Sequence, residues 1–487
     1  MSLVSLEFFV FLAIVLLLYN ISPRKARWLI LLAASLFFYG CTEIFAFIYI
    51  IFMTLSSYIF ALAVQKYQKE GSRFKISTSL AAAIIFVLSL WVALKLASGT
   101  GSILLPLGIS FYSLRIIAYL IDVKRKKTEA ERDFFKYLLF ISYFPLLIVG
   151  PVANYTEMSG SLYSGRRASG EELLSGLIRL LWGAFKKLVI ANTLSVPLAY
   201  IVADTEKYSG AYVLFLLVFY SAQIYADFSG GIDIVLGASG MLGISLPENF
   251  DRPFLSVTLK EFWNRWHITL GEWFERYVFF PLSLSKPMQR LSKVCRRRLG
   301  VKVGRKIPVY IATMITWLLT GLWHGIRQSF VAWGLINGAL VLISEEVSHL
   351  SDRFYNRHPS LKNRQRLLTA LSRARVFLII GAVRLLDVYG DVALTFKMII
   401  TAFYDFESYS SLLSGGFFAI ISPPAFITVL LSLILLFTVS ERRIKSSDIA
   451  KSPVFSAASV FSLILLSLLL GTYGEGFNAG DFIYSQF

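Results

Sequence analysis

The chain has 487 residues, of which 56% are hydrophobic and 15% aromatic, and its mean hydropathy is +0.65. Soluble domains are roughly 45–50% apolar, so this composition excludes an ordinary soluble protein and indicates an integral membrane protein. The formal net charge of +18 would suit a nucleic-acid binder, but the basic residues stand in connectors between apolar runs, so we expect no nucleic-acid partner.

Apolar runs of about 17 to 25 residues, the length that crosses a bilayer, recur along the whole chain. The first run lacks a basic start and a small-residue cleavage site, which favours a retained span over a signal peptide. Some runs are re-entrant or interfacial candidates, so we predict an all-α polytopic membrane protein with about 10–13 membrane helices. The predicted spans are 2–20, 28–40, 42–63, 77–98, 104–122, 134–153, 173–200, 208–228, 308–324, 328–345, 374–400, 416–439 and 453–472.

Lysine and arginine are unevenly distributed among the predicted connectors. Residues 40–43 and 97–101 carry none, whereas the connectors on either side of them are basic. The positive-inside rule therefore places the basic connectors in the cytoplasm and the N-terminus outside. Because these connectors are cationic, we expect them to contact anionic lipid head groups. They are 21–27, 65–75, 123–132, 286–306, 364–375 and 441–451.

Residues 223–285 mix charges, glycines and aromatic residues at a density that a lipid-facing helix does not tolerate. Such a segment must be buried in protein or line a watery cavity. Asp227 and Asp233 at its start are expected to pair with a basic group or to make a cavity polar. Further along, the apolar spacing predicts one helix over 259–277, at a membrane interface or a cavity mouth. Its predicted buried face is Phe262, Trp266, Leu270, Trp273 and Tyr277.

Two of the histidines stand in apolar surroundings. His324 lies in "GLWHGIRQSF" (321–330), where an ionisable side chain is costly unless it faces protein or water. His267 follows Trp266, and the residues around it, taken alone, favour an interfacial histidine whose hydrogen bonds are satisfied. The other two, His349 and His358, lie in a charged segment for which we predict a solvated loop.

Several chemistries lack their sequence signals. The chain has no G-x-x-x-x-G-K-[ST] loop and no H-E-x-x-H pair, which argues against an ATP-driven pump and a zinc hydrolase. No G-x-S-x-G elbow supports a serine acyl-enzyme. Cys41 and Cys295 are far apart and outside any ligand spacing. We therefore expect neither a metal site nor a disulfide.

The stretches "EFWNRWHITLGEWFERYVFFPL" (261–282) and "GLWHG" (321–325) resemble motifs of the membrane-bound O-acyltransferase family. They are most similar to its bacterial branch of alginate O-acetyltransferases and teichoic acid D-alanyl transfer proteins. The resemblance implies one membrane-embedded domain over 1–487, built around a central funnel or tunnel, with core motifs in 105–345 and C-terminal helices in 374–472. Further matching blocks are 105–127, 144–155, 223–238 and 473–487.

The resemblance also implies a function. Members of this branch move an acyl group to hydroxyls of a cell-surface polymer, so we expect a transferase in the bacterial cytoplasmic membrane. The expected group is acetyl, with D-alanyl as the alternative. No cofactor is expected to be bound, and the expected donor is a thioester such as acetyl-CoA or an acyl carrier protein. A separate extracytoplasmic protein that accepts or transfers the acyl group is the expected partner.

Two histidines match the family's functional positions: His324 falls on its essential histidine and His267 on a second important one. A neutral imidazole can take the hydroxyl proton as the oxygen attacks a thioester. We therefore predict His324 as the general base, and His267 as a second base, an orienter of the donor or a donor to the oxyanion. The predicted substrate-binding residues are Trp266, Trp323, Asp227 and Asp233.

One departure and one alternative remain. Many relatives carry a histidine where this chain has Asn337, so we expect no catalytic role for that position. The alternative is a transporter of an acyl carrier or lipid-linked sugar, with Asp227, Asp233 and the histidines as a proton relay. Transporters are often built from two related halves, and no convincing repeat links 1–240 to 241–487.

Overall fold

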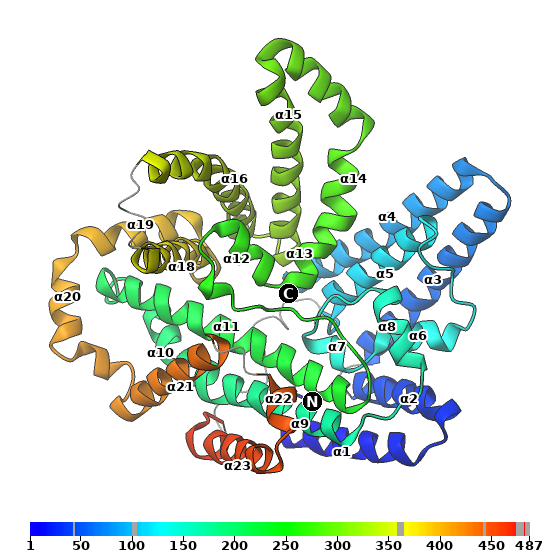
Figure 1. Ribbon diagram of the computed structural model, residues 1–487, viewed down its shortest axis with the longest axis horizontal. Coiled ribbons are helices and arrows are strands. Elements are labelled where there is room, and N and C mark those ends of the chain that lie inside the picture. Colours follow the sequence, from blue (N-terminus) through cyan, green and yellow to red (C-terminus); the bar gives the residue numbers. More distant parts are fainter. Residues whose placement is uncertain (42–43, 100–104, 358–364, 442–444, 474–481, 483–487) are drawn as a thin grey trace. The chain divides into compact units, whose positions relative to one another are not determined.

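The computed structural model describes residues 1–41, 44–99, 105–357, 365–441, 445–473 and 482, and every structural statement below concerns these residues. The regular elements among them are helices (Figure 1). The described residues also contain a single isolated antiparallel bridge, between Phe250 and Trp266. The predicted all-α fold is confirmed. The predicted loop at His349 was wrong, because α16 (Gln328–Arg357) continues through this residue. The side chain of His349 and the whole of His358 lie outside the described residues.

In the described ranges, 6 helices are long and apolar enough to cross a membrane, and three shorter apolar helices accompany them. The chain is therefore a polytopic membrane protein. The long helices are α3 (Ile44–Lys69), α4 (Arg73–Gly99), α11 (Ala211–Met241), α15 (Lys286–His324), α16 (Gln328–Arg357) and α23 (Pro453–Leu470). The shorter ones are α1 (Leu6–Ile21), α19 (Val392–Tyr404) and α21 (Pro423–Glu441).

Three predicted continuous spans are interrupted, and the prediction of single helices there was wrong. Span 134–153 divides at Tyr143, whose ψ of 112° is not helical, into α6 (Phe134–Ser142) and α7 (Pro145–Ile148), and Pro145 has no N–H to donate across the break. Span 374–400 breaks at Gly390, whose φ is 66°. In span 416–439 the long helix begins only at a proline pair, at Pro423.

The described residues form two compact units, which we describe separately. The first consists of Met1–Asn192, Ala226–Pro247 and Arg442–Phe487, and the second of Thr193–Tyr225 and Glu248–Glu441. The remaining elements of the first unit are η1 (Arg24–Ala26), α2 (Arg27–Gly40), α5 (Ile109–Lys124), α8 (Tyr155–Tyr163), α9 (Gly170–Phe185), the π-helical turn η2 (Lys186–Ala191) and α22 (Ser446–Ala450).

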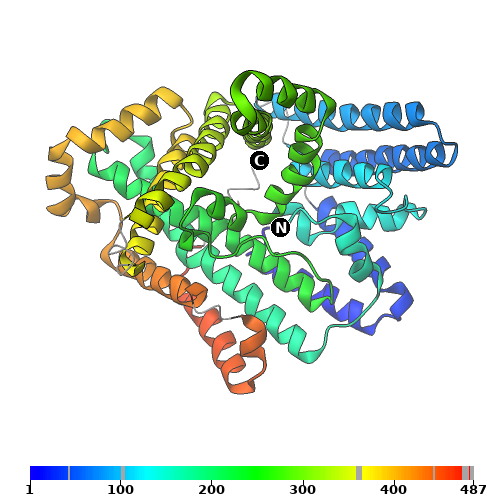
Figure 2. The ribbon, with the colours of Figure 1, turned by 45° about the horizontal axis from the view of Figure 1, so that its top comes forward.

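In the first unit, α3 and α4 form an antiparallel hairpin that packs on α5 (Figure 2). Helix α9 packs against α22 and α23, and its backbone lies very close to that of α11. A methyl group placed on Gly183 of α9 would lie 2.4 Å from the carbonyl oxygen of Gly230, and one placed on Gly237 of α11 would lie 2.5 Å from that of Gly176. Small residues of this kind let membrane helices approach closely.

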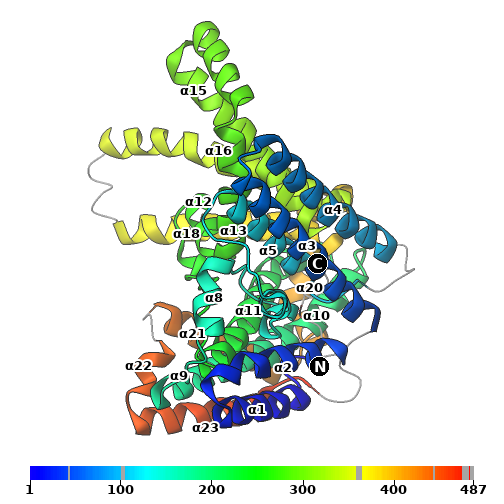
Figure 3. The same cartoon turned by 90° about the vertical axis from the view of Figure 1, so that its right-hand side faces the viewer.

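The second unit contains helix α10 (Asn192–Ala203) and a helical hairpin in α15, which reverses at Gly300, whose φ is 83°. The arm after this reversal packs on α16, and α18 (Gln365–Tyr389) then runs back along α16 (Figure 3). The other elements of this unit are η3 (Pro253–Leu255), α12 (Leu259–Arg265), α13 (Ile268–Phe274), the π-helical turn η4 (Glu275–Phe279), α14 (Phe280–Ser283), α20 (Phe406–Leu413) and η5 (Gly416–Ala419).

The close approach of α9 and α11 makes a testable prediction. Gly237→Ala should lower the melting temperature in detergent, because the new methyl group meets backbone atoms of α9. Gly240→Ala is the matched control on the same helix, since a methyl group there has nothing within 4 Å. Alanine is favoured over glycine in a helix by about 1 kcal/mol, so the control should melt at the same temperature or higher. Equal melting of the two variants would contradict the packing.

Candidate functional site

His267 stands at a break between two helices. Helix α12 ends at Arg265, Trp266 is extended, and His267 adopts the left-handed conformation with φ 49° and ψ 51° before α13 begins. The predicted single helix over 259–277 was therefore wrong. A left-handed conformation costs a residue with a side chain about 1–2 kcal/mol, so contacts from elsewhere in the fold must hold His267 in place.

Residues 249–251 supply those contacts. The Ile268 N–H donates to the Asn249 carbonyl at 3.0 Å, and the Asp251 N–H donates to the Arg265 carbonyl at 3.0 Å. These bonds replace the intrahelical bonds that the break removes. All the residues of the predicted apolar face are nevertheless buried, namely Phe262, Trp266, Leu270, Trp273 and Tyr277.

The imidazole of His267 is buried, with 4% of the residue exposed. Its Nδ1 lies 3.2 Å from Oδ1 of Asn249. Burial lowers the pKa of His267 well below its usual value, and the nearby His324 lowers it further by charge repulsion. His267 is therefore neutral near pH 7, the state in which an imidazole accepts a proton.

His324 is the last residue of α15 and is half-buried. Its ring lies 4.9 Å from that of Trp333 on α16 and 6.2 Å from that of Phe330. These contacts depend on the close approach of α15 and α16, since a methyl group on Gly321 would lie 2.4 Å from the Phe330 carbonyl oxygen. His324, at the end of α15, therefore lies among the aromatic rings of α16.

Trp323 contacts both histidines. Its ring centroid lies 6.1 Å from that of His267 and 4.9 Å from that of His324, and both contacts are edge-to-face. The structure thus brings together His267, Trp323 and His324, which come from two separate stretches of the sequence. This group is the candidate functional site.

Trp266 makes different contacts from those of its neighbour His267. Its ring stacks on Phe262 and meets Phe250 edge-on, with centroids 5.7 and 5.0 Å away. The Arg384 guanidinium of α18 lies over its face, with Cζ 3.9 Å from the centroid. Such a cation–π contact is strongest when desolvated, and both residues are buried. The side chain of Trp266 is therefore packed in the core directly before the break at His267. Its predicted contact with substrate stays a prediction.

Three residues near the site were missed from the sequence. Arg384 carries a signal that could have found it, because a cation inside the apolar run 374–400 is costly without a partner. Trp333 was one of several tryptophans without a distinguishing pattern. Asn249 contacts a residue 18 positions away, a separation that helical periodicity cannot report.

Asp227 and Asp233 lie in the first unit and are held in ion pairs. Lys187 Nζ lies 2.6 Å from Asp227 Oδ1, and Lys186 Nζ lies 2.6 Å from Asp233 Oδ2. Arg179 Nε lies 3.0 Å from the second oxygen of Asp233. Each carboxylate thus has a buried or half-buried cation beside it. Their predicted contact with substrate stays a prediction.

The two lysines are neighbours in sequence, and both reach α11. Lys187 pairs with Asp227, and Lys186 pairs with Asp233, which lies six residues further along α11. The π-helical turn begins at Lys186, and turns of this kind occur often at functional positions.

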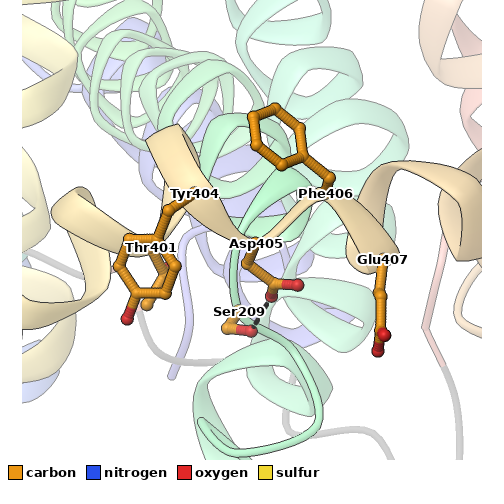
Figure 4. Close-up of a pocket in the computed structure, with 6 residues that line it drawn as sticks. All are labelled: Ser209, Thr401, Tyr404, Asp405, Phe406 and Glu407. Atoms are coloured by element: carbon orange, nitrogen blue, oxygen red, sulfur yellow. Dashed lines mark hydrogen bonds between the residues drawn. The ribbon is translucent and has the colours of Figure 1, made fainter.

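A pocket of about 410 Å³ lies between the start of α11 and the α19–α20 junction (Figure 4). The Ser209 hydroxyl donates to the Asp405 carboxylate, and the Gly210 N–H donates to Thr401 Oγ1 at 2.9 Å. The Ala211 N–H, the first of α11, donates to Ser408 Oγ at 2.8 Å, so these bonds join the start of α11 to α19 and α20. None of the predicted site residues lines it. Its lining is Ser209, Thr401, Tyr404, Asp405, Phe406 and Glu407.

Metal binding has little support among the residues that the structure describes. No group of three or more histidine, cysteine, aspartate or glutamate side chains there is placed to hold a metal ion. The chemistry available at the candidate site is that of neutral imidazole. It can accept a proton from a hydroxyl and return it to a leaving group.

The chain was compared with known proteins. The model of the membrane-bound O-acyltransferase family matches residues 31–294, a range that includes His267 and ends before His324. A "Probable alginate O-acetylase AlgI" from Pseudomonas fluorescens is 33% identical over 353 residues, which are 72% of this chain and 67% of that protein.

Two further relatives have other printed activities. A "Peptidoglycan O-acetyltransferase" from Helicobacter pylori is 28% identical over 69% of this chain and 67% of its own length. A "Teichoic acid D-alanyltransferase" from Streptococcus thermophilus is 28% identical over 51% of this chain and 59% of its own length. The alignments thus span about two thirds of these two acetylating relatives and less of the D-alanylating one.

The buried ion pair between Lys187 and Asp227 can be tested with a double-mutant cycle. Asp227→Leu alone removes the carboxylate beside the buried Lys187 ammonium, so it should cost about 3–5 kcal/mol of unfolding free energy. Lys187→Met combined with Asp227→Leu should recover most of that loss, because no charge remains buried. Melting of the purified variants in detergent measures both. Additive losses in the double variant would show that the two side chains do not interact.

The burial of His267 makes a second prediction, about pH. Because its folded pKa is depressed, only the unfolded chain takes up a proton as the pH falls through about 6.5, the ordinary value. The stability that depends on the neutral ring is therefore present above that pH and lost below it. His267→Gln removes this contribution, so its melting temperature should fall less than that of the wild type between pH 8 and pH 5.5. Parallel curves would contradict the burial.

Proposed function

The chain belongs to the membrane-bound O-acyltransferase family and is a membrane-bound O-acyltransferase, and from this premise we propose its substrates. It transfers an acetyl group from a cytoplasmic thioester donor across the membrane, for O-acylation of a cell-surface polysaccharide or related polymer. The observation that carries the proposal is the aromatic-lined pair of imidazoles, His267 and His324, in a chain of this family. Both rings contact Trp323.

The histidines fit the chemistry of the transfer. The acceptor hydroxyl oxygen attacks the thioester carbonyl carbon, and its proton passes to the imidazole of His324. The tetrahedral intermediate then collapses, the carbon–sulfur bond breaks, and the imidazolium returns the proton to the leaving thiolate. His324 is assigned as the base because it is half-buried at a helix end, where an acceptor can reach it. His267 is more deeply buried and either orients the donor or stabilises the oxyanion.

Acetyl is preferred because of the sequence identities. The alginate O-acetylases are 31–34% identical to this chain over the aligned residues, and the D-alanyltransferases are 26–28% identical. D-Alanyl transfer to teichoic acid is the second candidate, since that relative belongs to the same comparison. The family membership argues against the alternative of a transporter, because the family name describes acyl transfer.

The donor side and the partners follow from the charge of the connectors. The hairpin arms 286–306 are rich in lysine and arginine and contain no acidic residue, which supports a cytoplasmic position by the positive-inside rule. A thioester such as acetyl-CoA or an acylated carrier protein would then meet the chain from the cytoplasm of a bacterial cell. The N-terminus lies outside in this arrangement, and an extracytoplasmic protein receives the acyl group or passes it to the polymer.

The assignment of the histidines predicts the effect of removing each one. His324→Ala should lower acyl transfer by about two orders of magnitude or more, since a positioned base contributes about 10²- to 10⁴-fold. His267→Ala should also lower it, by a smaller factor. The measurement is ester-linked acetyl released from envelope polysaccharide of cells producing each variant, quantified by mass spectrometry per folded molecule in the membrane.

Two controls accompany this experiment. His358→Gln changes a histidine in the charged segment and should keep full activity, and Asn337→His should be tolerated because that position is not assigned to catalysis. Full transfer by folded His324→Ala protein would remove the assignment of the base. Passage of an unmodified substrate through proteoliposomes without ester formation would favour the transporter instead.

A further inference from the structure

Asn249 is held beside His267 by the backbone as well as by its side chain. Segments 249–251 and 265–268 pair in antiparallel fashion through two backbone hydrogen bonds and the bridge between Phe250 and Trp266. Asn249 is fully buried. Its amide therefore has a fixed position relative to the imidazole, without competition from bulk water.

The orientation of the Asn249 amide is determined by Thr269. The Thr269 backbone N–H lies 3.1 Å from Oδ1 of Asn249, and the Thr269 hydroxyl lies 2.9 Å from the same atom. A backbone N–H can only donate, so the amide atom that faces it must be the acceptor oxygen. A flipped amide would place two donors against each other. The hydrogen-bond network thus settles an assignment that amide density by itself often leaves open.

This orientation determines the protonation of His267. Nδ1 of the imidazole lies 3.2 Å from the same Asn249 oxygen. The oxygen has no proton to give, so the hydrogen between the two atoms belongs to Nδ1. The neutral ring then carries its basic lone pair on Nε2, because a neutral imidazole has one N–H and one acceptor nitrogen.

We propose that Asn249 is a positioning residue that holds His267 in the Nδ1–H tautomer and so makes Nε2 its basic nitrogen. The tautomer follows from the geometry alone, whereas its consequence for turnover rests on the proposed function. The same contacts hold the left-handed backbone of His267, a conformation that costs about 1–3 kcal/mol and that clusters at functional sites. A second group that fixes a histidine tautomer is a common arrangement in catalytic sites.

A purely structural role for Asn249 is the competing explanation. Its oxygen accepts from Thr269, which lies in the first turn of α13, and so satisfies one of the N–H groups that a helix start leaves open. That role predicts a loss of stability when Asn249 is replaced, but no particular tautomer of His267. The tautomer is therefore the observable that separates the two explanations.

Nuclear magnetic resonance can measure the tautomer directly. The chain has only four histidines, so protein labelled with ¹⁵N-histidine gives few ring signals, and the loss of one set in His267→Gln identifies that residue. The wild type should show a protonated Nδ1 and an unprotonated Nε2. Asn249→Ala should show the reverse tautomer or a mixture, whereas Asn249→Asp should keep Nδ1–H. An Nε2–H ring in the wild type, or an unchanged ring in Asn249→Ala, would overturn the proposal.

Asn337→Ala is the matched control for this measurement. Asn337 is also buried, and its side-chain NH₂ donates to the Trp333 carbonyl at 2.9 Å, whereas the Asn249 oxygen accepts from His267. The substitution therefore removes a buried amide from the same unit and should leave the His267 signals in the Nδ1–H pattern. If Asn249→Ala does not fold, the wild type and Asn249→Asp decide the question, because a ring protonated on Nε2 and not on Nδ1 in either one refutes the assignment.

Turnover in proteoliposomes, with acetyl-CoA or an acetylated carrier protein as the thioester, tests the catalytic consequence. Asn249→Ala should lower kcat about 10- to 100-fold, the usual cost of losing a group that orients a functional histidine, with KM little changed. Asn249→Asp should keep the tautomer, but its carboxylate raises the pKa of His267 and moves the acid limb of the kcat profile to higher pH. Full activity of His267→Gln would refute the role of His267 in the proposed function and leave the tautomer result standing.

Discussion

The hydrogen bonds between Asn249 and the His267–Thr269 turn are the constraint on which the candidate site depends. They allow a residue with a side chain to remain left-handed, and this conformation follows the extended Trp266 that ends α12 and redirects the chain into α13. Without the break, residues 259–277 would continue as one helix, and the ring of His267 would follow the helix rotation instead of the pairing with segment 249–251. The contact with Trp323 depends on that redirection.

A second constraint operates in the first unit, where charges are buried instead of neutral rings. Removing ions from water costs several kcal/mol each, and only good geometry with a partner offsets that cost. The glycine contacts between α9 and α11 bring the backbones close enough for short lysine–aspartate pairs, and the π-helical turn lies where those lysines begin. Packing and electrostatics are thus coupled, because the pairs form only while the helices stay close.

The two units use burial for different ends. In the first, buried ion pairs hold Asp227 and Asp233 against Lys187 and Lys186, which suits holding helices together. In the second, burial disfavours charge on His267, which suits accepting a proton. Tryptophans around the histidines supply apolar surface with few competing hydrogen-bond groups. For an acyltransferase this setting matters, because water at the site would compete with the intended acceptor for the acyl group.

The sequence by itself determined the membrane class, the helical fold and the family, because hydropathy and composition are summed over local residues and the motifs are contiguous. It also predicted the buried face from Phe262 to Tyr277 correctly, since burial follows apolar spacing. Prolines and Gly390 were visible as interruptions, although counting apolar residues alone passed over them. Only the tertiary structure decided that the helix breaks at His267, that the histidines share Trp323, and that Asp227 and Asp233 pair with lysines 40 and 47 positions away. The physical reason is range: propensity and periodicity report neighbours within a few residues, whereas a left-handed histidine and a buried charge are stable only through partners that the fold brings from a distance.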